Sequence, residues 1–245
     1  MKPFLSIIIP AYNEAKRLPL TLVDVDKHLS MAEYSYEIIV VDDGSKDTTV
    51  ETTKRLAGLI KNLRVLENKE NHGKGFVVRQ GMLSAKGNFR LFMDADNSTS
   101  VDQFEQMMPF LSARSGKKYD VVIGSRAVSG AKLDPPEPFY KRILGKGGNL
   151  FIQIVAVWGI ADTQCGFKCF SEESAEKIFA VARSDRWAFD VEALALARKF
   201  RFRIKEIPVR WVNDLRSHVK FSAYFTTLLE VVKIRWWLVI NVYKI

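Results

Sequence analysis

The sequence predicts an α/β fold in which helices cover both faces of a mostly parallel, doubly wound sheet. The first observation behind this prediction is that continuous apolar runs of strand length recur along the chain, as at residues 4–9 and 89–93. The second is that apolar residues at helical spacing, such as Leu18, Leu22 and Val25, lie between these runs. Strands that alternate with helices are joined by right-handed crossovers, which leave the strands side by side and parallel.

The first half of the chain contains four expected strands with helices between them. Strands are expected at residues 4–9, 37–41, 63–66 and 89–93, and helices at residues 18–29, 50–60 and 79–85. Pro10 has no backbone N–H, so we expect the first strand to stop there and residues 10–14 to form an exposed loop.

The second half is less regular. Residues 120–126 predict a further strand that ends in Arg126, and the proline-rich stretch 129–138 is expected to be a linker. Residues 150–158 are expected to form an apolar helix, residues 162–168 a polar turn, and residues 186–192 the start of another helix.

Composition limits the class of protein. The 245 residues are 47% hydrophobic, which suffices for one large α/β domain or two small ones and argues against disorder. The net charge of +9 predicts an acidic partner, which is nucleic acid, an anionic membrane or a phosphorylated substrate. Cys165 and Cys169 lie four residues apart, a spacing that suits neither a disulfide framework nor a zinc site. We therefore expect reduced thiols that pack in the core of a cytosolic protein.

Two carboxylates follow the strand expected at residues 89–93. Asp94 and Asp96 stand at its carboxyl end, which is where ligands bind in open α/β sheets. Carboxylate oxygens are hard ligands that suit Mg²⁺ or Mn²⁺ held together with substrate phosphates. The alternative is that one Asp caps the next helix and the other is solvated. Three successive strand ends carry acid or glycine loops, and this convergence favours the metal site.

The second and third strands also end in candidate binding loops. Asp42 and Asp43 are placed to accept hydrogen bonds from a ribose or a base edge, and the alternative is that Asp43 and Gly44 simply form a turn. The loop after the third strand contains Gly73 and Gly75. A single GxG is not a dinucleotide-binding fingerprint, because the third glycine and the strand-turn-helix order are missing.

Two apolar segments are candidates for contact with a membrane surface. Residues 147–161 are shorter than the roughly 20 residues that a transmembrane helix needs, and Met1 to Phe4 lead directly into a strand, so we expect neither a spanning segment nor a signal peptide. The helix at 150–158 carries Trp158 and follows a basic stretch, and the tail at 221–245 mixes aromatic side chains with Lys and Arg. The alternative is that both segments pack in the core or form the interface of a homo-oligomer.

A set of short motifs, taken in order, resembles one enzyme family over nearly the whole chain. The motifs are IIIPAYNE (7–14), VVDDGSKDT (40–48), NHGKG (71–75), DAD (94–96) and GSR (124–126). In this order they resemble the family 2 glycosyltransferases with a GT-A fold. The motifs DTQCGFK (162–168) and RWAFDVE (186–192) are similar to dolichyl-phosphate glucosyltransferases, more so than to dolichyl-phosphate mannose synthases.

The resemblance implies an inverting enzyme that moves a hexose, glucose from UDP-glucose, onto a polyprenyl phosphate. It implies that Asp94 and Asp96 hold Mg²⁺ or Mn²⁺, which neutralises the departing diphosphate. The acceptor phosphate is already ionised near neutral pH, so its attack on the anomeric carbon needs little help from a general base. Within the family, a mannosyltransferase that uses GDP-mannose is the alternative.

The resemblance also implies roles for individual residues. The nucleotide is expected to be bound by Pro10, Tyr12, Glu14, Asp42, Asp43, Gly73 and Lys74. The donor diphosphate is expected to meet Arg216, His218 and Lys220, whose alternative is a solvated basic loop. Arg126 and Arg142 are expected to clamp the acceptor phosphate, because a guanidinium binds phosphate in a fork. Asp190 takes the position of a catalytic base in relatives with hydroxyl acceptors, and here we expect it to orient the sugar or acceptor, or to cap its helix.

These expectations divide the chain into a catalytic domain at residues 1–220 and an amphipathic, membrane-surface segment at residues 221–245. The protein is then expected to be peripheral, on the cytoplasmic face of a membrane. The alternative from another class is a basic nucleic-acid-binding protein. That class requires a basic stripe on a recognition helix or a base-stacking strand motif, and neither is evident, so we expect no nucleic acid partner.

Overall fold

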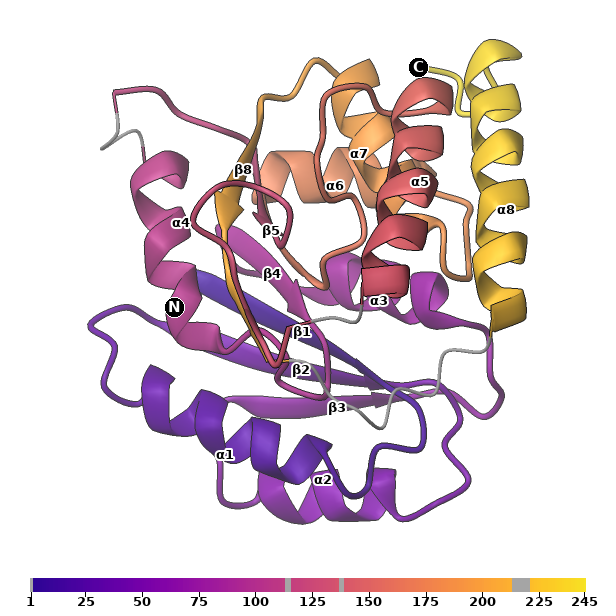
Figure 1. The fold of residues 1–245 in the computed structure, drawn as a ribbon. Coiled ribbons are helices and arrows are strands. Elements are labelled where there is room, and N and C mark those ends of the chain that lie inside the picture. Colours follow the sequence, from indigo (N-terminus) through magenta and orange to yellow (C-terminus); the bar gives the residue numbers. More distant parts are fainter. Residues whose placement is uncertain (1, 113–115, 137–138, 213–220) are drawn as a thin grey trace.

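The computed structural model describes residues 2–112, 116–136, 139–212 and 221–245, and within these ranges the side chains of 139–144 and 221–224 are not described. Its main strands are β1 (Leu5–Ala11), β2 (Tyr36–Asp42), β3 (Leu63–Glu67), β4 (Phe89–Met93), β5 (Val121–Ser125), β7 (Phe167–Ser171) and β8 (Ile204–Pro208). These form one sheet in the order β3-β2-β1-β4-β7-β5-β8 (Figure 1). Only β7 runs antiparallel to its neighbours, so the predicted mostly parallel α/β fold is confirmed.

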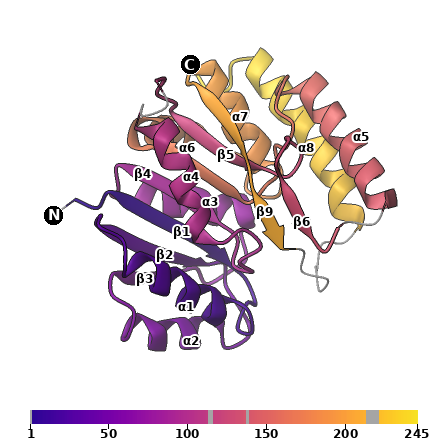
Figure 2. The ribbon, with the colours of Figure 1, turned by 60° about the vertical axis from the view of Figure 1, so that its left-hand side comes forward.

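A second, smaller sheet lies beside the first. It pairs β6 (Lys132–Asp134) with β9 (Arg210–Val212) in parallel, as Figure 2 shows. The short strand β6 falls in the stretch that the sequence predicted to be a linker.

Helices cover both faces of the main sheet. They are α1 (Leu18–Leu29), α2 (Thr49–Ala57), α3 (Lys74–Ser84), α4 (Phe104–Leu111), α5 (Phe139–Val155), α6 (Glu172–Val181), α7 (Phe189–Lys199) and α8 (Phe221–Val239). Helices α1, α2 and α4 cover one face and α3, α6 and α7 the other, with α5 and α8 side by side outside α7 (Figures 1 and 2). Along β1, Ile7 and Ile9 point into the core on the side of α1, α2 and α4, and Ile8 points into the core on the side of α3, α6 and α7. Burial on both faces explains why the strand is apolar at consecutive positions.

The parallel pairing brings four loops to one edge of the sheet. Strand β2 ends at Asp42, while Asp94 directly follows β4 and Arg126 directly follows β5. Strand β7 runs the other way, so it begins at this edge, where Phe167 pairs with Met93. The segment before β7 therefore lies at the same edge of the sheet as the carboxyl ends of the parallel strands.

Three local predictions are wrong. Residues 162–168 are not all turn, because Phe167 and Lys168 belong to β7. Helix α3 begins at Lys74 and not near residue 79, since Gly73 provides the left-handed backbone (φ 107°) that starts it. Pro10 lies inside β1. Strand β4 pairs with β1 only as far as Ile8, so Pro10 has one neighbouring strand, where a missing donor is tolerated.

Two further observations bear on the sequence predictions. Both cysteines are free and buried, as expected. Among the described residues, no helix combines the length and hydrophobicity that crossing a bilayer requires.

Candidate active site

The end of β4 carries the two candidate metal ligands. Asp94 donates its N–H to the Gly166 carbonyl at 3.2 Å, and its side chain is 20% exposed. A Cβ atom on Gly166 would lie 1.9 Å from Oδ2 of Asp94, so only glycine allows this close approach. The Asp96 side chain is 23% exposed, and its Oδ1 accepts the Ser98 N–H at 3.0 Å. The Asp96 carboxylate is thus held by a backbone N–H, the Asp94 backbone is fixed to Gly166, and both carboxylates remain partly open to solvent.

These two carboxylates fit a divalent cation that takes other ligands from a substrate. Within the described ranges, no cluster of three or more His, Cys, Asp or Glu side chains could hold a metal ion. Mg²⁺ in proteins is commonly held by one or two carboxylates together with substrate phosphates. The donor set at Asp94 and Asp96 matches that pattern rather than an all-protein cage.

A lysine lies directly on the first of these carboxylates. Nζ of Lys74 is 2.5 Å from Oδ1 of Asp94 and 5.7 Å from the centre of the Trp187 ring. Burial would lower the pKa of Lys74, but the carboxylates of Asp94 and Asp190 outweigh it and raise the pKa. Lys74 is therefore a fixed positive charge at the edge of the sheet.

Two glycines beside Lys74 pack closely against the backbone at residues 184–185, and this packing fixes the position of Lys74. A Cβ on Gly73 would lie 2.4 Å from the Asp185 carbonyl oxygen, and one on Gly75 would lie 2.3 Å from the Ser184 carbonyl oxygen. The Phe76 N–H at the start of α3 donates to the same Asp185 carbonyl at 3.1 Å. In this structure both glycines have a packing reason, and the nucleotide role of Gly73 stays a prediction.

A second charged pair is fully buried behind the first. Lys168, which is not exposed at all, donates from Nζ to Asp190 Oδ1 and to the Cys165 carbonyl, both at 2.6 Å. Burial raises the pKa of the Asp190 carboxyl, and the ammonium groups of Lys168 and Lys74 oppose this effect. Asp190 thus lies between two lysines, and its neighbour Lys74 connects it to Asp94.

The two carboxylates at the end of β2 accept hydrogen bonds from backbone N–H groups of the protein itself. The Asp42 carboxylate accepts the N–H groups of Gly44 at 3.0 Å and Ser45 at 2.9 Å, which is the turn that the sequence left open as an alternative. The Asp43 carboxylate accepts the N–H groups of His72 and Gly73, both at 2.8 Å. Asp43 therefore ties the loop before α3 to the end of β2.

The loop after β1 contains the remaining nucleotide candidates. Pro10 is buried, and Tyr12 is 44% exposed. Glu14 accepts from Arg17 Nε at 2.7 Å, and Nη1 of Arg17 is 3.9 Å from Asp96 Oδ2. Arg17 therefore links this loop to the end of β4, a role that the sequence did not predict.

Arg126 is held by an acid from the segment before β7. Its Nε and Nη2 donate to the two oxygens of Asp162 at 2.7 and 3.0 Å, and its guanidinium carbon lies 4.7 Å from the Trp211 ring centre. Burial would raise the pKa of Asp162, but Arg126 outweighs it and lowers the pKa to about 2. Asp162 thus fixes the direction of the Arg126 fork.

Some predicted site residues cannot be placed. Arg216, His218, Lys220 and the side chain of Arg142 lie outside the described residues. Conversely, Lys168 and Asp162 were not singled out as site residues. Lys168 carried a signal, because a lysine between Phe167 and Cys169 in an apolar run must be buried with a counter-charge.

A family model and curated proteins similar to this chain all describe glycosyltransferases. The family model described as glycosyl transferase family 2 matches residues 6–179. A dolichyl-phosphate beta-glucosyltransferase from Dictyostelium discoideum is 38% identical over 99% of this chain and 77% of its own length. The enzymes of the same name from Drosophila melanogaster and Homo sapiens are 41% and 35% identical, each over 85% of this chain and 67% of the relative.

Solved structures with the same fold are more distant in sequence. Glucosyl-3-phosphoglycerate synthase from Mycobacterium tuberculosis, in complex with Mn²⁺, UDP and phosphoglyceric acid, has a TM-score of 0.65 at 14% identity, covering 95% of this chain and 77% of the other. S. aureus TarS 1–349 in complex with UDP-GlcNAc has a TM-score of 0.59 at 18% identity, covering 97% and 67%. The predicted GT-A fold is therefore confirmed.

Proposed function

The chain belongs to glycosyl transferase family 2, and on that premise we propose that it transfers glucose from UDP-glucose to a dolichyl-type polyprenyl phosphate, with inversion at the anomeric carbon. The observation that carries this proposal is the sequence identity of 34–41% to curated dolichyl-phosphate beta-glucosyltransferases. Two of these alignments cover 99% of the chain. The comparisons do not favour the alternative mannosyltransferase that uses GDP-mannose.

Asp94 and Asp96 would hold the divalent cation, Mg²⁺ or Mn²⁺, together with the donor diphosphate. When bound, the cation neutralises the charge that develops on the departing nucleoside diphosphate. Partial exposure of both carboxylates at the edge of the sheet supports this assignment. A structural neighbour that contains Mn²⁺ and UDP supports it further.

The chain's own residues would bind and orient the two substrates. Lys74, whose Nζ lies 2.5 Å from Oδ1 of Asp94, would bind the nucleotide together with Tyr12, which is 44% exposed. Pro10, Glu14, Asp42, Asp43 and Gly73 complete the proposed nucleotide pocket, and Arg216, His218 and Lys220 complete the diphosphate site. Positioning and charge stabilisation would supply most of the rate, because an ionised acceptor phosphate is already a nucleophile.

The acceptor phosphate would meet Arg126 and Arg142. The ion pair with Asp162 supports the role of Arg126, because it holds the guanidinium in one direction at the end of β5. Asp190 would orient the sugar or the acceptor from its place between Lys168 and Lys74.

The lipid part of the acceptor implies a membrane surface, and we propose that α5 and α8 face it from the cytoplasmic side. The end of α5 and the residues after it expose Leu150, Ile154 and Trp158. On and just beyond α8, the exposed apolar residues are Phe225, Leu229, Val232, Trp236, Val239 and Ile240. The two helices lie side by side (Figures 1 and 2). The proposed membrane surface would consist of these exposed apolar residues with the exposed Lys233 and Arg235 nearby, as in interfacial helices.

A donor panel with a polyprenyl phosphate acceptor tests the proposed function. UDP-glucose, GDP-mannose and UDP-GlcNAc are each supplied with Mg²⁺ or Mn²⁺, and the lipid product is identified by mass spectrometry and anomeric NMR. We expect a β-linked glucosyl lipid from UDP-glucose, and no product when the metal is chelated. Transfer from GDP-mannose in preference to UDP-glucose would refute the proposed donor, and binding of nucleic acid without any transfer would favour the other class.

A further inference from the structure

The C-terminal segment, which consists of α8 and the residues after it, makes two polar contacts at the start of the helix that carries Asp190. Glu230 of α8 accepts the Ala188 N–H through Oε2 at 3.1 Å. Tyr243, four residues beyond the end of α8, donates from its hydroxyl to Glu192 Oε1 at 2.7 Å. Ala188 and Glu192 are the residues two before and two after Asp190, so the two contacts bracket it.

The first contact completes the start of α7. Helix α7 begins at Phe189, and Ala188 is its N-cap, which makes no side-chain hydrogen bond. Backbone N–H groups at a helix start lack partners within the helix, and a negative charge there is favourable. Glu230 supplies both an acceptor and a charge from a different helix.

The second contact is shared with the segment that supports Lys74. Glu192 is fully buried, and its carboxylate also accepts the N–H groups of Arg183 at 3.0 Å and Ser184 at 2.8 Å. The same segment packs on Gly73 and Gly75 through the carbonyls of Asp185 and Ser184. One carboxylate therefore joins the C-terminal residues, α7 and the start of α3.

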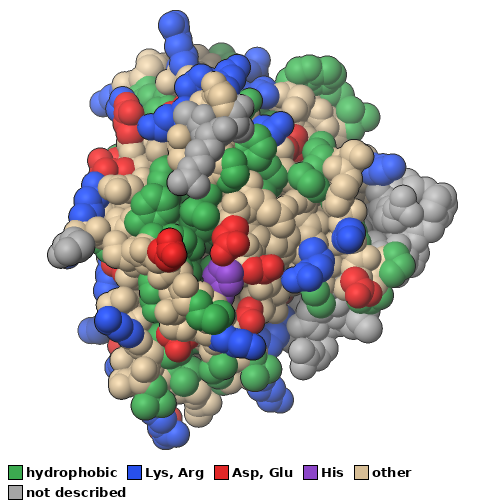
Figure 3. Space-filling view, turned by 90° about the vertical axis from the view of Figure 1, so that its left-hand side faces the viewer, with side chains coloured by type: hydrophobic (Ala, Val, Ile, Leu, Met, Phe, Trp, Pro, Cys, Tyr) green, Lys and Arg blue, Asp and Glu red, His purple; other side chains and the backbone are tan. Residues whose placement is uncertain are grey.

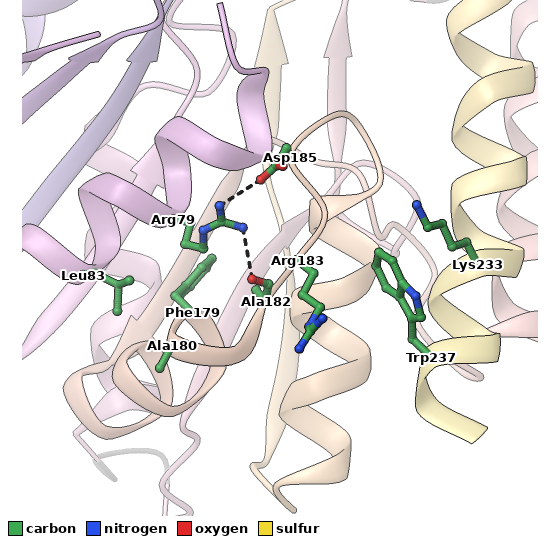
Figure 4. A pocket seen from close by; sticks show the side chains of 9 residues that line it. All are labelled: Arg79, Leu83, Phe179, Ala180, Ala182, Arg183, Asp185, Lys233 and Trp237. Atoms are coloured by element: carbon green, nitrogen blue, oxygen red, sulfur yellow. Dashed lines mark hydrogen bonds and ion pairs between the residues drawn. The ribbon is translucent and has the colours of Figure 1, made fainter. Parts of the chain in front are cut away.

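The C-terminal segment is anchored to the rest of the protein by buried side chains, so its contacts with α7 have a fixed position. Val231, Ile234 and Tyr243 are buried in the core that α8 shares with α7, and the Trp237 and Tyr243 rings meet edge to face at 6.2 Å. A pocket of about 590 Å³ lies beside these contacts. In Figure 4, Lys233 and Trp237 of α8 lie across the pocket from Arg183, and Arg79 of α3 bonds to Ala182 and Asp185. The segment at 182–185 thus lies between α3 and α8.

We propose that Glu230 and Tyr243 are positioning residues, which hold the first turn of α7 so that Asp190 keeps its contact with Lys168. The C-terminal segment is then part of the support of the active site as well as a surface for the membrane. This inference rests on the proposed function, in which Asp190 orients the sugar or the acceptor.

The test compares variants that remove one contact each. Tyr243→Phe removes the hydroxyl but keeps the ring, and Glu230→Leu removes the acceptor, whereas Glu230→Gln keeps an oxygen that can accept the Ala188 N–H. The matched control is Tyr34→Phe, because Tyr34 Oη is buried and has no hydrogen-bond partner among the described residues. For each variant, hydrogen exchange of the amides at 188–192 is measured, together with kcat and KM for UDP-glucose in detergent with a short-chain polyprenyl phosphate.

We expect faster exchange at the start of α7 in Tyr243→Phe and Glu230→Leu, with kcat lowered about tenfold and KM for the donor changed by less than about twofold. Tyr34→Phe should resemble the unchanged protein in both measurements, and Glu230→Gln, which keeps the acceptor but loses the charge, should lie between the unchanged protein and Glu230→Leu. Unchanged exchange in Tyr243→Phe and Glu230→Leu would overturn the inference, and so would faster exchange with unaltered kcat. If the unchanged protein transfers no hexose, the proposed function fails, and the exchange measurement alone decides whether these residues position α7.

Discussion

The two carboxylates at the end of β4 have different cationic neighbours. Asp94 forms an ion pair with Lys74, whereas Asp96 lies 3.9 Å from Arg17. Asp94→Asn and Asp96→Asn keep nearly the same volume but remove the charge that a divalent cation needs. We expect each change to lower transfer at least about a hundredfold, with the fold retained. Glu51→Gln, an exposed carboxylate on α2, is the control. Near-normal turnover of Asp96→Asn at saturating Mn²⁺ would contradict the metal assignment.

The Asp42 carboxylate holds a turn of the fold, and it is also proposed to line the nucleotide pocket. Asp42→Ala leaves the N–H groups of Gly44 and Ser45 without their acceptor, which should lower the free energy of unfolding by about 1–3 kcal/mol. If the side chain also lines the nucleotide pocket, binding of free UDP should weaken as well. Calorimetry with Asp42→Ala and Asp42→Asn separates these effects, because Asn keeps one oxygen for the turn. Unchanged affinity for UDP in the alanine variant would count against the nucleotide role.

Asp162 makes the stability of the protein depend on acid pH. Arg126 outweighs burial and lowers the pKa of Asp162 from 3.8 to about 2, so the unfolded chain binds the proton more readily between these values. The stabilisation is therefore complete above about pH 4 and is lost as the pH falls towards 2. Its size is roughly 2 kcal/mol.

Urea unfolding of the unchanged protein and of Asp162→Asn measures this contribution. The difference in free energy of unfolding should be largest at pH 7 and should shrink as the pH is lowered from 4 to 2. A difference that is independent of pH would show that the ion pair with Arg126 does not lower the pKa of Asp162.

At the scale of elements, the proposed membrane surface lies on α5, on the residues just after it and on α8. Trp158 and Trp236 are 67% and 60% exposed, so Trp158→Glu and Trp236→Glu should leave the core intact and weaken attachment to lipid. Flotation with anionic liposomes measures the effect, and the double variant should float least. Leu59→Glu, which changes an exposed residue at the end of α2, is the control and should float normally.

Removal of the chain from Phe221 onwards is a poorer test of the same idea. It would also remove Val231, Ile234 and Tyr243, which are buried against the rest of the protein. Loss of flotation after such a truncation could then come from an exposed core rather than from a lost membrane surface. Point changes on the exposed side of α8 avoid this confusion, and equal flotation of the two tryptophan variants and the unchanged protein would refute the membrane surface.

For the whole molecule, the net charge of +9 sets a long-range preference for anionic partners. Figure 3 shows one face on which Lys and Arg side chains lie mainly towards the edges, while several acidic side chains gather near the middle. The visible basic side chains of this face form no continuous stripe of the kind that nucleic acid binding uses.

This charge predicts a salt-dependent attachment to lipid. The protein should float with anionic vesicles at low salt, float less at about 1 M salt, where the Debye length is about 3 Å, and bind neutral vesicles weakly throughout. Flotation that is equal on neutral and anionic vesicles would show that the apolar face of α5 and α8 acts without help from the charge.

Much of the fold could be predicted from local patterns. The apolar runs that became β1, β2, β4 and β5 are buried on both faces of the sheet, so their sequence is apolar at successive positions and easy to recognise. Strand β7 escaped prediction because Lys168 and Ser171 interrupt its apolar residues. Its antiparallel place between β4 and β5 depends on pairing with strands far away in the sequence.

The candidate site divides in the same way. The sequence alone predicted that Asp94, Asp96, Asp42 and Arg126 lie at the carboxyl ends of the strands, because a polar residue at or just beyond the end of an apolar strand lies at the edge of the sheet. Which of these side chains touch each other was decided only by the tertiary structure. Lys168 and Asp190 are 22 residues apart, and Arg126 and Asp162 are 36 residues apart, so no local pattern could reveal either pair. The physical reason is that a buried charge is stabilised by whichever opposite charge the folded chain brings to it, and that partner exists only once the strands and helices are packed.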